Sequence, residues 1–379
     1  MIVYSLFELC SIMSLTALTK HFESIKDPRQ QIKVIYSLHD VLFLTVTAII
    51  AGCEGWEDIE DFGYCRLEWL RQYASFEHGI PVHDTIARLI SRVNPDALHR
   101  CFVEWMKETE TLTDNQVIAI DGKTLRRSYD PSDRKSAIHM VSAFASQNGV
   151  VMGQLKTDAK SNEITAIPEL LDLLELKGHL VTLDAMGCQT KIAKKIIEKE
   201  ANYLLAVKGN QGSLHQAIQQ AFYDDSQNEH SAVFSYLEQQ RGRTEYRKYE
   251  VLQADPLQLT EKWSKLTTIG RAIYYRVENG KELIDTRYYI SSAQLSAEEL
   301  AKHVRSHWAV ENQLHWVLDV SFKEDNCPIN RGHAAENFST FRHVGLNQLK
   351  RETTLKASVR RKQRRAAMDT EYLDKVIRA

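Results

Sequence analysis

Carboxylates stand at the ends of two apolar runs and again on a predicted helix. The runs are Val117-Ile118-Ala119-Ile120-Asp121 and Leu180-Val181-Thr182-Leu183-Asp184, and the third carboxylate is that of Glu311. A carboxylate at the end of a buried strand costs free energy unless it is paired or holds a cation. Three carboxylates brought together by a fold form a site for hard divalent metals. Such sites serve phosphoryl transfer, in which two metal ions stabilise the attacking and the leaving oxygen.

The charge of this set indicates what it would bind. Asp121, Asp184 and Glu311 would carry three negative charges, which repel one another strongly without cations. Two Mg²⁺ ions would offset this charge, and one of them would activate water or a 3′-hydroxyl. Lys123 would then neutralise a phosphate. Gly122 directly follows the first aspartate and leaves room for a ligand to approach.

Plainer interpretations of the same residues stay open. A single aspartate at a strand end is more often a turn residue or a helix cap. Glu311 has Arg305 and Lys302 as alternative ion-pair partners on its own helix. The neighbouring candidates have the same two interpretations, site residue or ordinary core or surface residue of a helix: His307, Trp308, Asn312, His315 and Trp316.

The elements that position these residues follow from the hydrophobic pattern. From about residue 116, short apolar runs alternate with helical patterns, which predicts a mixed α/β sheet with helical crossovers. The predicted strands span residues 117–120, 138–145, 150–155, 179–183 and 203–207, and the predicted helices span residues 164–176, 191–199 and 213–222. A sheet presents ligands at the carboxyl ends of its strands, which is where Asp121 and Asp184 stand.

Two further segments complete this region. Residues 225–293 contain alternating segments and are predicted to be a β-rich insertion. Ser296-Ala297-Glu298-Glu299 then resembles a capping box at the start of a helix. That helix carries a stripe at steps of three and four, formed by Leu300, Val304, His307, Glu311, Leu314 and Leu318. The stripe predicts that Glu311 faces inward.

The N-terminal third of the chain is predicted to be helical. Its expected helices span residues 41–50, 57–73, 85–93 and 95–106. The helices around the Gly79-Ile80-Pro81 turn would either read DNA or simply pack, and their loop is longer than that of a regular helix-turn-helix. Met13 is an alternative start to Met1, which would make residues 1–12 a disordered extension.

The composition is that of a soluble globular protein. Of 379 residues, 43% are hydrophobic and 26% are charged, and this length suits two or three domains. The six cysteines form no close-spaced pairs, which argues against a disulfide framework or a zinc knuckle and favours a reducing cytosol. No apolar stretch is long enough to span a bilayer, so no membrane contact is expected.

Basic residues are concentrated locally, although the net charge of −2 gives no signal for nucleic acid. Between Lys350 and Arg365, eight lysines and arginines face a single acid, Glu352. A second group consists of Arg241, Arg243, Arg247 and Lys248. Each group is either a solvated face or a surface that contacts phosphates, and in the second case binding would be sensitive to salt.

Several short motifs occur in order along the chain. They are Asp121-Gly122-Lys123, Leu183-Asp184-Ala185 and His307-Trp308-Ala309-Val310-Glu311-Asn312-Gln313-Leu314-His315-Trp316, supported by Asp27-Pro28-Arg29, Lys160-Ser161-Asn162-Glu163-Ile164, Lys208-Gly209-Asn210-Gln211, Leu318-Asp319-Val320-Ser321-Phe322-Lys323-Glu324-Asp325, and Arg342-His343 with Leu346-Asn347. Each motif is weak alone. Together, from about residue 15 to the C-terminus, they resemble bacterial insertion-sequence transposases of the DDE type, in particular the H repeat-associated group.

The resemblance implies an α/β fold, namely a ribonuclease-H-like mixed sheet with flanking helices and a β-rich insertion, preceded by a helical N-terminal domain. It implies cutting of DNA at element ends and joining of 3′-hydroxyls to target DNA, with two Mg²⁺ or Mn²⁺ ions. Asp121, Asp184 and Glu311 become the catalytic, metal-binding triad. The candidates for DNA contact are Lys123, Lys208, Asn210, Arg305, His307 and Asn312.

The sequence departs from the family pattern around the glutamate. Related DDE transposases often carry a Tyr-Arg-Glu-Lys signature there. The corresponding positions in this chain are Val304, His307, Glu311 and Leu318, with Arg305 as a partial substitute. The functions tied to that signature, gripping a 5′ phosphate or a flipped base, therefore do not carry over, and no hairpin intermediate is assumed.

The expected organisation has three parts. A helical N-terminal domain spans residues 1–112, the catalytic domain spans residues 113–345 with its insertion at about 225–293, and a basic tail spans residues 346–379. The expected protein is cytoplasmic, binds double-stranded DNA, and works as a homodimer or larger synaptic complex. Two other functions stay open: a catalytically silent DNA-binding relic, and a metal-dependent nuclease without strand transfer.

Overall fold

A computed structural model describes residues 19–110, 115–129, 132, 137–157, 163–225, 231–240, 243–254, 262–278 and 281–379. Within these residues the chain is a mixed α/β protein, as predicted. The segments that the sequence analysis placed at residues 1–12 and 241–242 lie outside the described part. None of the described helices is long and apolar enough to cross a membrane.

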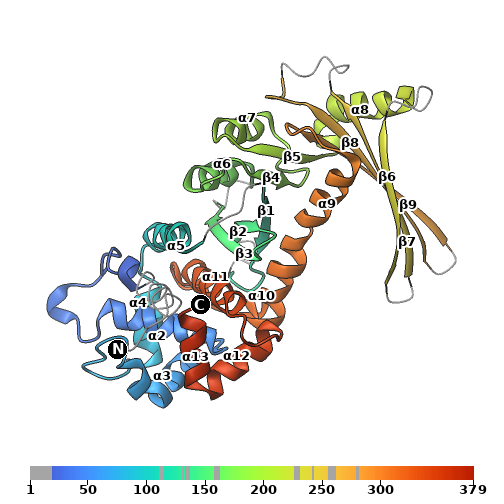
Figure 1. The fold of residues 1–379 in the computed structure, drawn as a ribbon. Coiled ribbons are helices and arrows are strands. Elements are labelled where there is room, and N and C mark those ends of the chain that lie inside the picture. Colours follow the sequence, from blue (N-terminus) through green and yellow to red (C-terminus); the bar gives the residue numbers. More distant parts are fainter. Residues whose placement is uncertain are drawn as a thin grey trace, which may run out of the picture.

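The elements follow one another from a helical part into the sheet and back to helices (Figure 1). The helices are α2 (Leu38–Ile50), α3 (Trp56–Leu70), α4 (His83–Ile90), α5 (Pro95–Thr109), α6 (Glu163–Leu173), α7 (Thr190–Glu198), α8 (Gly212–Asp225), α9 (Ala297–His307), α10 (Trp316–Ser321), α11 (Ala334–Arg351), α12 (Val359–Met368) and α13 (Thr370–Ile377). Shorter turns are the 3-10 helices η1 (Gln31–Lys33), η3 (Gly209–Gln211) and η6 (Glu324–Asn326), and the π-helix η5 (Val310–His315). The strands are β1 (Val117–Thr124), β2 (His139–Ala145), β3 (Val150–Lys156), β4 (Leu180–Leu183), β5 (Asn202–Val207), β6 (Ala232–Gln240), β7 (Arg243–Gln253), β8 (Thr268–Glu278) and β9 (Lys281–Ser291).

The described strands form one nine-stranded sheet in the order β3-β2-β1-β4-β5-β9-β8-β7-β6. β1 pairs antiparallel with β2 and parallel with β4, and β4 pairs parallel with β5. Parallel strands need crossover connections, which include α6 and α7. β4 and the first half of β1 are fully buried, because parallel strands of this kind are covered on both faces. Their carboxyl ends meet at one edge of the sheet.

Four strands continue the sheet beyond β5. β9 pairs antiparallel with β5, and β8, β7 and β6 follow, each antiparallel to its neighbour. Residues 232–291, where strands were expected, therefore extend the central sheet rather than form a sheet of their own. They reach away from the helical part as a long arm (Figure 1).

Helix α9 joins this arm to the centre of the sheet, on the face opposite α6 and α7 (Figure 1). It contacts β1 and β4 in the centre and β6, β7 and β8 in the arm. At Gly270 of β8, an added Cβ would lie 2.6 Å from the Leu300 side chain, so this close approach of α9 requires glycine. The position of α9 thus depends on both halves of the sheet.

The helical part surrounds α2, which is buried on nearly all sides because apolar residues surround its axis. Helix α11 packs along α2, and Gly345 faces Ile49 and Ile50 there. Helix α11 also contacts α5 and β3, so it connects the helical part to the sheet. The expected boundary between residues 345 and 346 falls inside this continuous helix.

Residues 346–379, predicted to be a basic tail, form the end of α11 and the packed helices α12 and α13. Helices α12 and α13 lie beside the N-terminal helices (Figure 1). Trp69 Nε1 and the Tyr73 hydroxyl of the N-terminal part both donate to Asp374 Oδ1, at 2.8 and 2.5 Å. The division of the chain into three domains stays a prediction.

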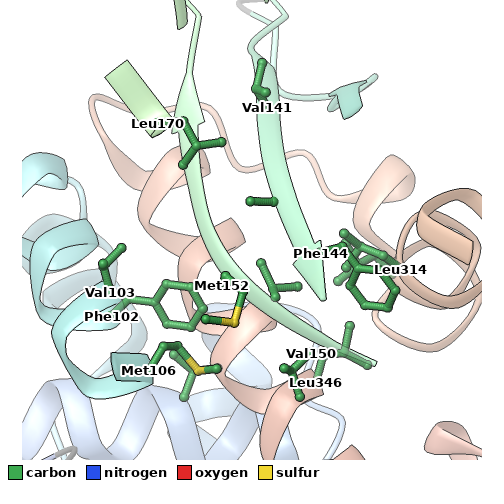
Figure 2. Packing of buried hydrophobic residues seen from close by; sticks show 14 of the residues in the cluster. Phe102, Val103, Met106, Val141, Phe144, Val150, Met152, Leu170, Leu314 and Leu346 are labelled. Atoms are coloured by element: carbon green, nitrogen blue, oxygen red, sulfur yellow. The ribbon is translucent and has the colours of Figure 1, made fainter. Parts of the chain in front are cut away.

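Figure 2 shows the core between the helical part and the sheet. Phe102 and Met106 of α5 lie beside Met152 of β3, while Leu314 of η5 lies beside Phe144 of β2. All of these side chains are nearly inaccessible to solvent. Close packing of this kind holds the helices in fixed positions relative to the strands that carry the site.

Candidate active site

The three carboxylates predicted from the sequence line one cavity of about 540 Å³ at the carboxyl ends of the central strands. Asp121 belongs to β1, Asp184 directly follows β4, and Glu311 belongs to η5. Lys208 and Gly209, which follow β5, line the same cavity. The fold thus brings together residues that lie almost 200 positions apart in the chain.

Asp121 is largely buried at the point where the apolar run of β1 ends. Burial raises the pKa of this carboxyl to about 7, and the nearby negative charges of Glu163, Asp184 and Glu311 act in the same direction. Its nearest basic group is His315, whose Nδ1 lies 3.6 Å from Asp121 Oδ2. Burial lowers the pKa of His315 to about 4, so this histidine is neutral near pH 7 and does not offset the charge.

Asp184 sits in a turn that its own side chain helps to hold. Asp184 Oδ1 accepts hydrogen bonds from the backbone N–H groups of Met186 and Gly187, at 2.9 and 3.2 Å. This pattern is an aspartate turn, one of the plain interpretations of a strand-end aspartate. One carboxylate oxygen is used in the turn, which leaves the other available to a ligand in the cavity.

Glu311 differs from the prediction, because its side chain is exposed rather than turned toward the core. Residues Val310–His315 form a π-helix, in which the Trp316 N–H donates to the Glu311 carbonyl five residues earlier. A wider turn shifts the apolar stripe by one position. Val310, not Glu311, is buried together with Leu314. Glu311 therefore lines the cavity from an exposed position.

The donor chemistry of this set fits a hard divalent cation. Within the described residues, neither Asp184 nor Glu311 has an ion pair, and Arg305 and Lys302 do not pair with Glu311. No three histidine, cysteine or acidic side chains of the described part converge closely enough to enclose one ion. Mg²⁺ commonly takes one or two carboxylates and completes its shell with water and substrate phosphates, so a preformed cage is not required.

Lys123 has a different environment from the one predicted. Its ammonium group pairs with Asp319, with Glu324 Oε2 at 2.9 Å and with Asp325 Oδ1 at 3.8 Å. Burial alone would lower the pKa of Lys123, but the charges of Glu324 and Asp319 outweigh it and raise the pKa. A lysine held by three carboxylates is poorly placed to neutralise a phosphate.

Lys208 and Asn210 lie beside the site, as the motif suggested. The Lys208 side chain is exposed at the cavity. Asn210 Nδ2 donates to the Ala185 carbonyl at 2.6 Å and so ties the loop after β5 to the loop after β4. Within the described residues Lys208 has no ion pair, whereas Asn210 holds the backbone next to Asp184.

The remaining candidates on the α9–η5 segment are mostly engaged in internal contacts. Arg305 donates two hydrogen bonds to Glu238 of β6, at 2.7 and 3.0 Å. His307 Nδ1 lies 2.9 Å from Thr182 Oγ1, and burial lowers the pKa of His307 to about 4. Asn312 is exposed and donates to the Trp308 carbonyl at 3.2 Å. Arg305 and His307 therefore fix the helix against the arm and β4.

Arg287 and Glu163 were not candidates in the sequence analysis. Trp308 and Trp316, which the sequence left as either site or core residues, are 38% and 60% exposed, and Trp308 lines the cavity. The guanidinium of Arg287 lies 5.0 Å from the Trp308 ring centroid, and both residues line the cavity at Asp121 and a second cavity of about 710 Å³. Glu163 of α6 is the other, and its place within a quoted motif was the one available signal. Nothing in the sequence of β9, which carries Arg287, indicated the contact between Arg287 and Trp308.

The predicted basic surfaces are smaller than the sequence suggests. Arg241 and the side chain of Arg243 lie outside the described part, Arg247 pairs with Glu238 and Glu245, and Lys248 pairs with Glu250. Lys362 is buried and donates to the Leu349 and Glu352 carbonyls at the end of α11. The exposed basic residues of the C-terminal group are Lys356 and, on α12, Arg360, Arg361, Arg364 and Arg365, of which Arg365 pairs with Asp369 at 2.7 Å.

Comparisons with known proteins agree across nearly the whole chain. The Transposase DDE domain family matches residues 112–347, and the DDE_Tnp_1-associated family matches residues 19–106. The chain is 49% identical over 372 residues to the "H repeat-associated putative transposase YhhI" of Escherichia coli (strain K12), covering 96% of this chain and 98% of that protein. It is 55% identical over 80 residues to the "Inactive transposase YbfQ" of the same strain, covering 21% of this chain and 95% of that protein.

A solved structure also resembles this fold. The chain superposes on the piggyBac transposase of a synaptic complex with hairpin DNA, with a TM-score of 0.48 and 11% sequence identity. The superposition covers 96% of this chain and 80% of the other. A TM-score of this size is too low to support an inference about the site.

Proposed function

The chain belongs to the DDE transposase family, in its H repeat-associated group, and on this premise we propose that it cuts DNA at insertion-sequence ends and joins the 3′-hydroxyls to target DNA. The observation that carries the proposal is the convergence of Asp121, Asp184 and Glu311 on one cavity without cationic partners in the described residues. Such a site is unfavourable until it binds cations.

We assign the residues the following roles. Asp121, Asp184 and Glu311 hold two divalent ions, Mg²⁺ or Mn²⁺. When bound, these ions supply an activated oxygen nucleophile and stabilise the leaving oxygen. Burial disfavours the charged form of Asp121 until a cation binds, while Asp184 is oriented by its turn. His307 stays neutral and fixes the helix that carries Glu311 through Thr182.

The fold of the core supports the same proposal. We take the strands β3-β2-β1-β4-β5 to be a ribonuclease-H-like core, because three antiparallel strands are followed by two that run parallel to β1. This topology sets the carboxyl ends of β1, β4 and β5 at one edge. The strands β6–β9 are then the insertion between β5 and the glutamate-bearing segment.

The substrate we propose is double-stranded DNA, bound by a homodimer or larger synaptic complex. Lys208 at the cavity and the exposed Arg360, Arg361 and Arg364 of α12 are the positions best able to contact phosphates. Arg287 and Trp308 offer a cation and an exposed ring beside the site. Lys123 and Arg305 are not assigned to DNA, because their charges are taken up by carboxylates of the protein.

The test uses DNA that carries the ends of the protein's own genomic locus, with Mg²⁺ or Mn²⁺. We expect metal-dependent cleavage and strand joining that Asp184→Asn reduces by at least about 1000-fold, because the substitution keeps the acceptor for the turn and removes the charge. The matched control is Glu298→Gln, an exposed carboxylate on α9, which should leave both steps unchanged.

Each outcome separates the candidate functions. Cleavage without joining would replace the proposal by a metal-dependent nuclease. End binding without cleavage would indicate a silent DNA-binding relic. Equal activity in the Asp184→Asn variant would remove Asp184 from the site, and neither binding nor cleavage would contradict DNA as the substrate.

A further inference from the structure

The side chain of Glu163, the first residue of α6, lies against Gly122 near the end of β1. A Cβ atom placed on Gly122, which follows Asp121, would lie 2.2 Å from Glu163 Oε1 and 2.3 Å from His139 Nε2. Atoms at that separation would clash, so a side chain at position 122 would drive Glu163 away. Gly122 thus leaves room for a fourth carboxylate beside the residue that follows Asp121.

Glu163 is held in this place by a short chain of hydrogen bonds. Its Oε1 lies 2.8 Å from His139 Nε2, and His139 Nδ1 lies 2.9 Å from Thr124 Oγ1. Thr124 and His139 face each other on the paired strands β1 and β2, which fixes the imidazole. In the neutral ring, Nε2–H donates to the carboxylate while Nδ1 accepts from the threonine hydroxyl.

The arrangement leaves the second carboxylate oxygen of Glu163 uncommitted. In the described part of the chain, Oε2 takes part in no hydrogen bond or ion pair, and the Glu163 side chain is 13% exposed. Ligating carboxylates are commonly oriented in this way, with one oxygen fixed by a hydrogen bond from the protein. The same pattern holds for Asp184, whose Oδ1 is used by its turn.

We propose that Glu163 is a fourth carboxylate ligand of the divalent-metal centre and shares an ion with Asp121. The proposal rests on the proposed function, because it needs a metal centre at Asp121. His139 and Thr124 are its positioning residues. A purely structural ion pair between Glu163 and His139 at the start of α6 is the alternative, and it predicts no effect on metal binding.

Metal binding can be measured without DNA or catalysis. We expect Glu163→Gln to weaken the affinity of the full-length protein for Mn²⁺ by at least about 10-fold. Electron paramagnetic resonance of free and bound Mn²⁺ measures this affinity. Glutamine keeps the acceptor for His139, so the melting temperature without metal should not fall. Glu298→Gln is the matched control and should bind Mn²⁺ like the wild type.

A second variant tests the geometry rather than the charge. Gly122→Ala keeps all four carboxylates but displaces Glu163, so it should weaken Mn²⁺ binding to a similar extent. Glu163→Asp should bind more strongly than Glu163→Gln. Unchanged Mn²⁺ affinity in Glu163→Gln, with weakened affinity in Asp121→Asn, would overturn the role of Glu163 alone. Unchanged affinity in both variants would overturn the metal centre itself.

Discussion

Two acidic clusters begin two residues apart on β1 and differ in their charge balance. Around Asp121, the carboxylates of Asp184, Glu311 and Glu163 gather with neutral His307 and His315 beside them. Around Lys123, three carboxylates pair with three basic side chains. The carboxylates are those of Asp319, Glu324 and Asp325, and the basic side chains are Lys123, Arg126 and Arg342. The first cluster is short of positive charge, and the second is satisfied by the protein alone.

This difference separates the proposed metal site at Asp121 from the structural ion-pair network at Lys123. The Lys123 network joins β1 to the segments at α10, η6 and α11, and Glu324 is only 2% exposed within it. Burial alone would raise the pKa of Glu324, but Lys123 and Arg342 hold it below its usual range. Asp121, by contrast, has its pKa raised by burial and by other carboxylates. Carboxylates alone therefore do not identify the site, whereas uncompensated carboxylates do.

The largest expected effect comes from Asp121→Asn. Cleavage should fall by at least about 1000-fold, because the carboxylate shared by the metal centre is lost. The metal-free protein should nevertheless become more stable, by about 1–3 kcal/mol at pH 8, because a costly buried charge is removed. Cleavage assays and thermal unfolding of the same preparation test both parts.

The stability gain in Asp121→Asn depends on pH with a definite sign. A pKa raised from 3.8 to about 7 in the folded state means that Asp121 supports stability at low pH and loses that contribution as pH rises through about 7. The gain over the wild type should therefore be small near pH 4 and grow up to about pH 7. A gain that shrinks with rising pH would contradict the buried, uncompensated state of Asp121.

The opposite sign is expected for Glu324→Gln. Removing one partner of a buried charge network leaves Arg342 without its carboxylate and takes one of three carboxylates from Lys123, which should destabilise the fold by about 3–5 kcal/mol. Because the folded pKa of Glu324 lies below its ordinary value of 4.5, this loss should be full above that pH and fade below it. Urea unfolding at pH 7 and pH 4 measures it, with Glu298→Gln as the control. A neutral or stabilising effect would erase the distinction between the clusters.

The smallest effect is expected on the rim of the catalytic cavity. Lys208→Ala should weaken DNA binding a few-fold and reduce the slope of log affinity against log salt by about 1, because one phosphate contact is lost. Lys177→Ala is the matched control, since Lys177 is exposed before the start of β4, at the other edge of the sheet. Equal slopes in the wild type and Lys208→Ala would exclude Lys208 from the DNA contact.

Much of the sheet was predictable because each strand depends on a local pattern. The apolar runs before Asp121 and Asp184 became adjacent parallel strands, and the Gln147-Asn148-Gly149 segment joins β2 to β3 as a hairpin. The exposure of Glu311 was predicted wrongly, because a π-turn changes the helical period without a clear sequence signal. The strands of the arm were expected, but their pairing with β5 through β9 was not.

The sequence by itself determined which carboxylates end the central strands and which family the chain belongs to, because both depend on residue order. Only the tertiary structure decided which charges are neutralised. Lys123 meets Asp319 and Glu324 across 196 and 201 residues, and Arg305 meets Glu238 across 67. The strength of an ion pair depends on the distance between the charges in space, not along the chain. Packing alone therefore decides that the carboxylates around Lys123 are paired with lysine and arginine side chains and that those around Asp121 are not.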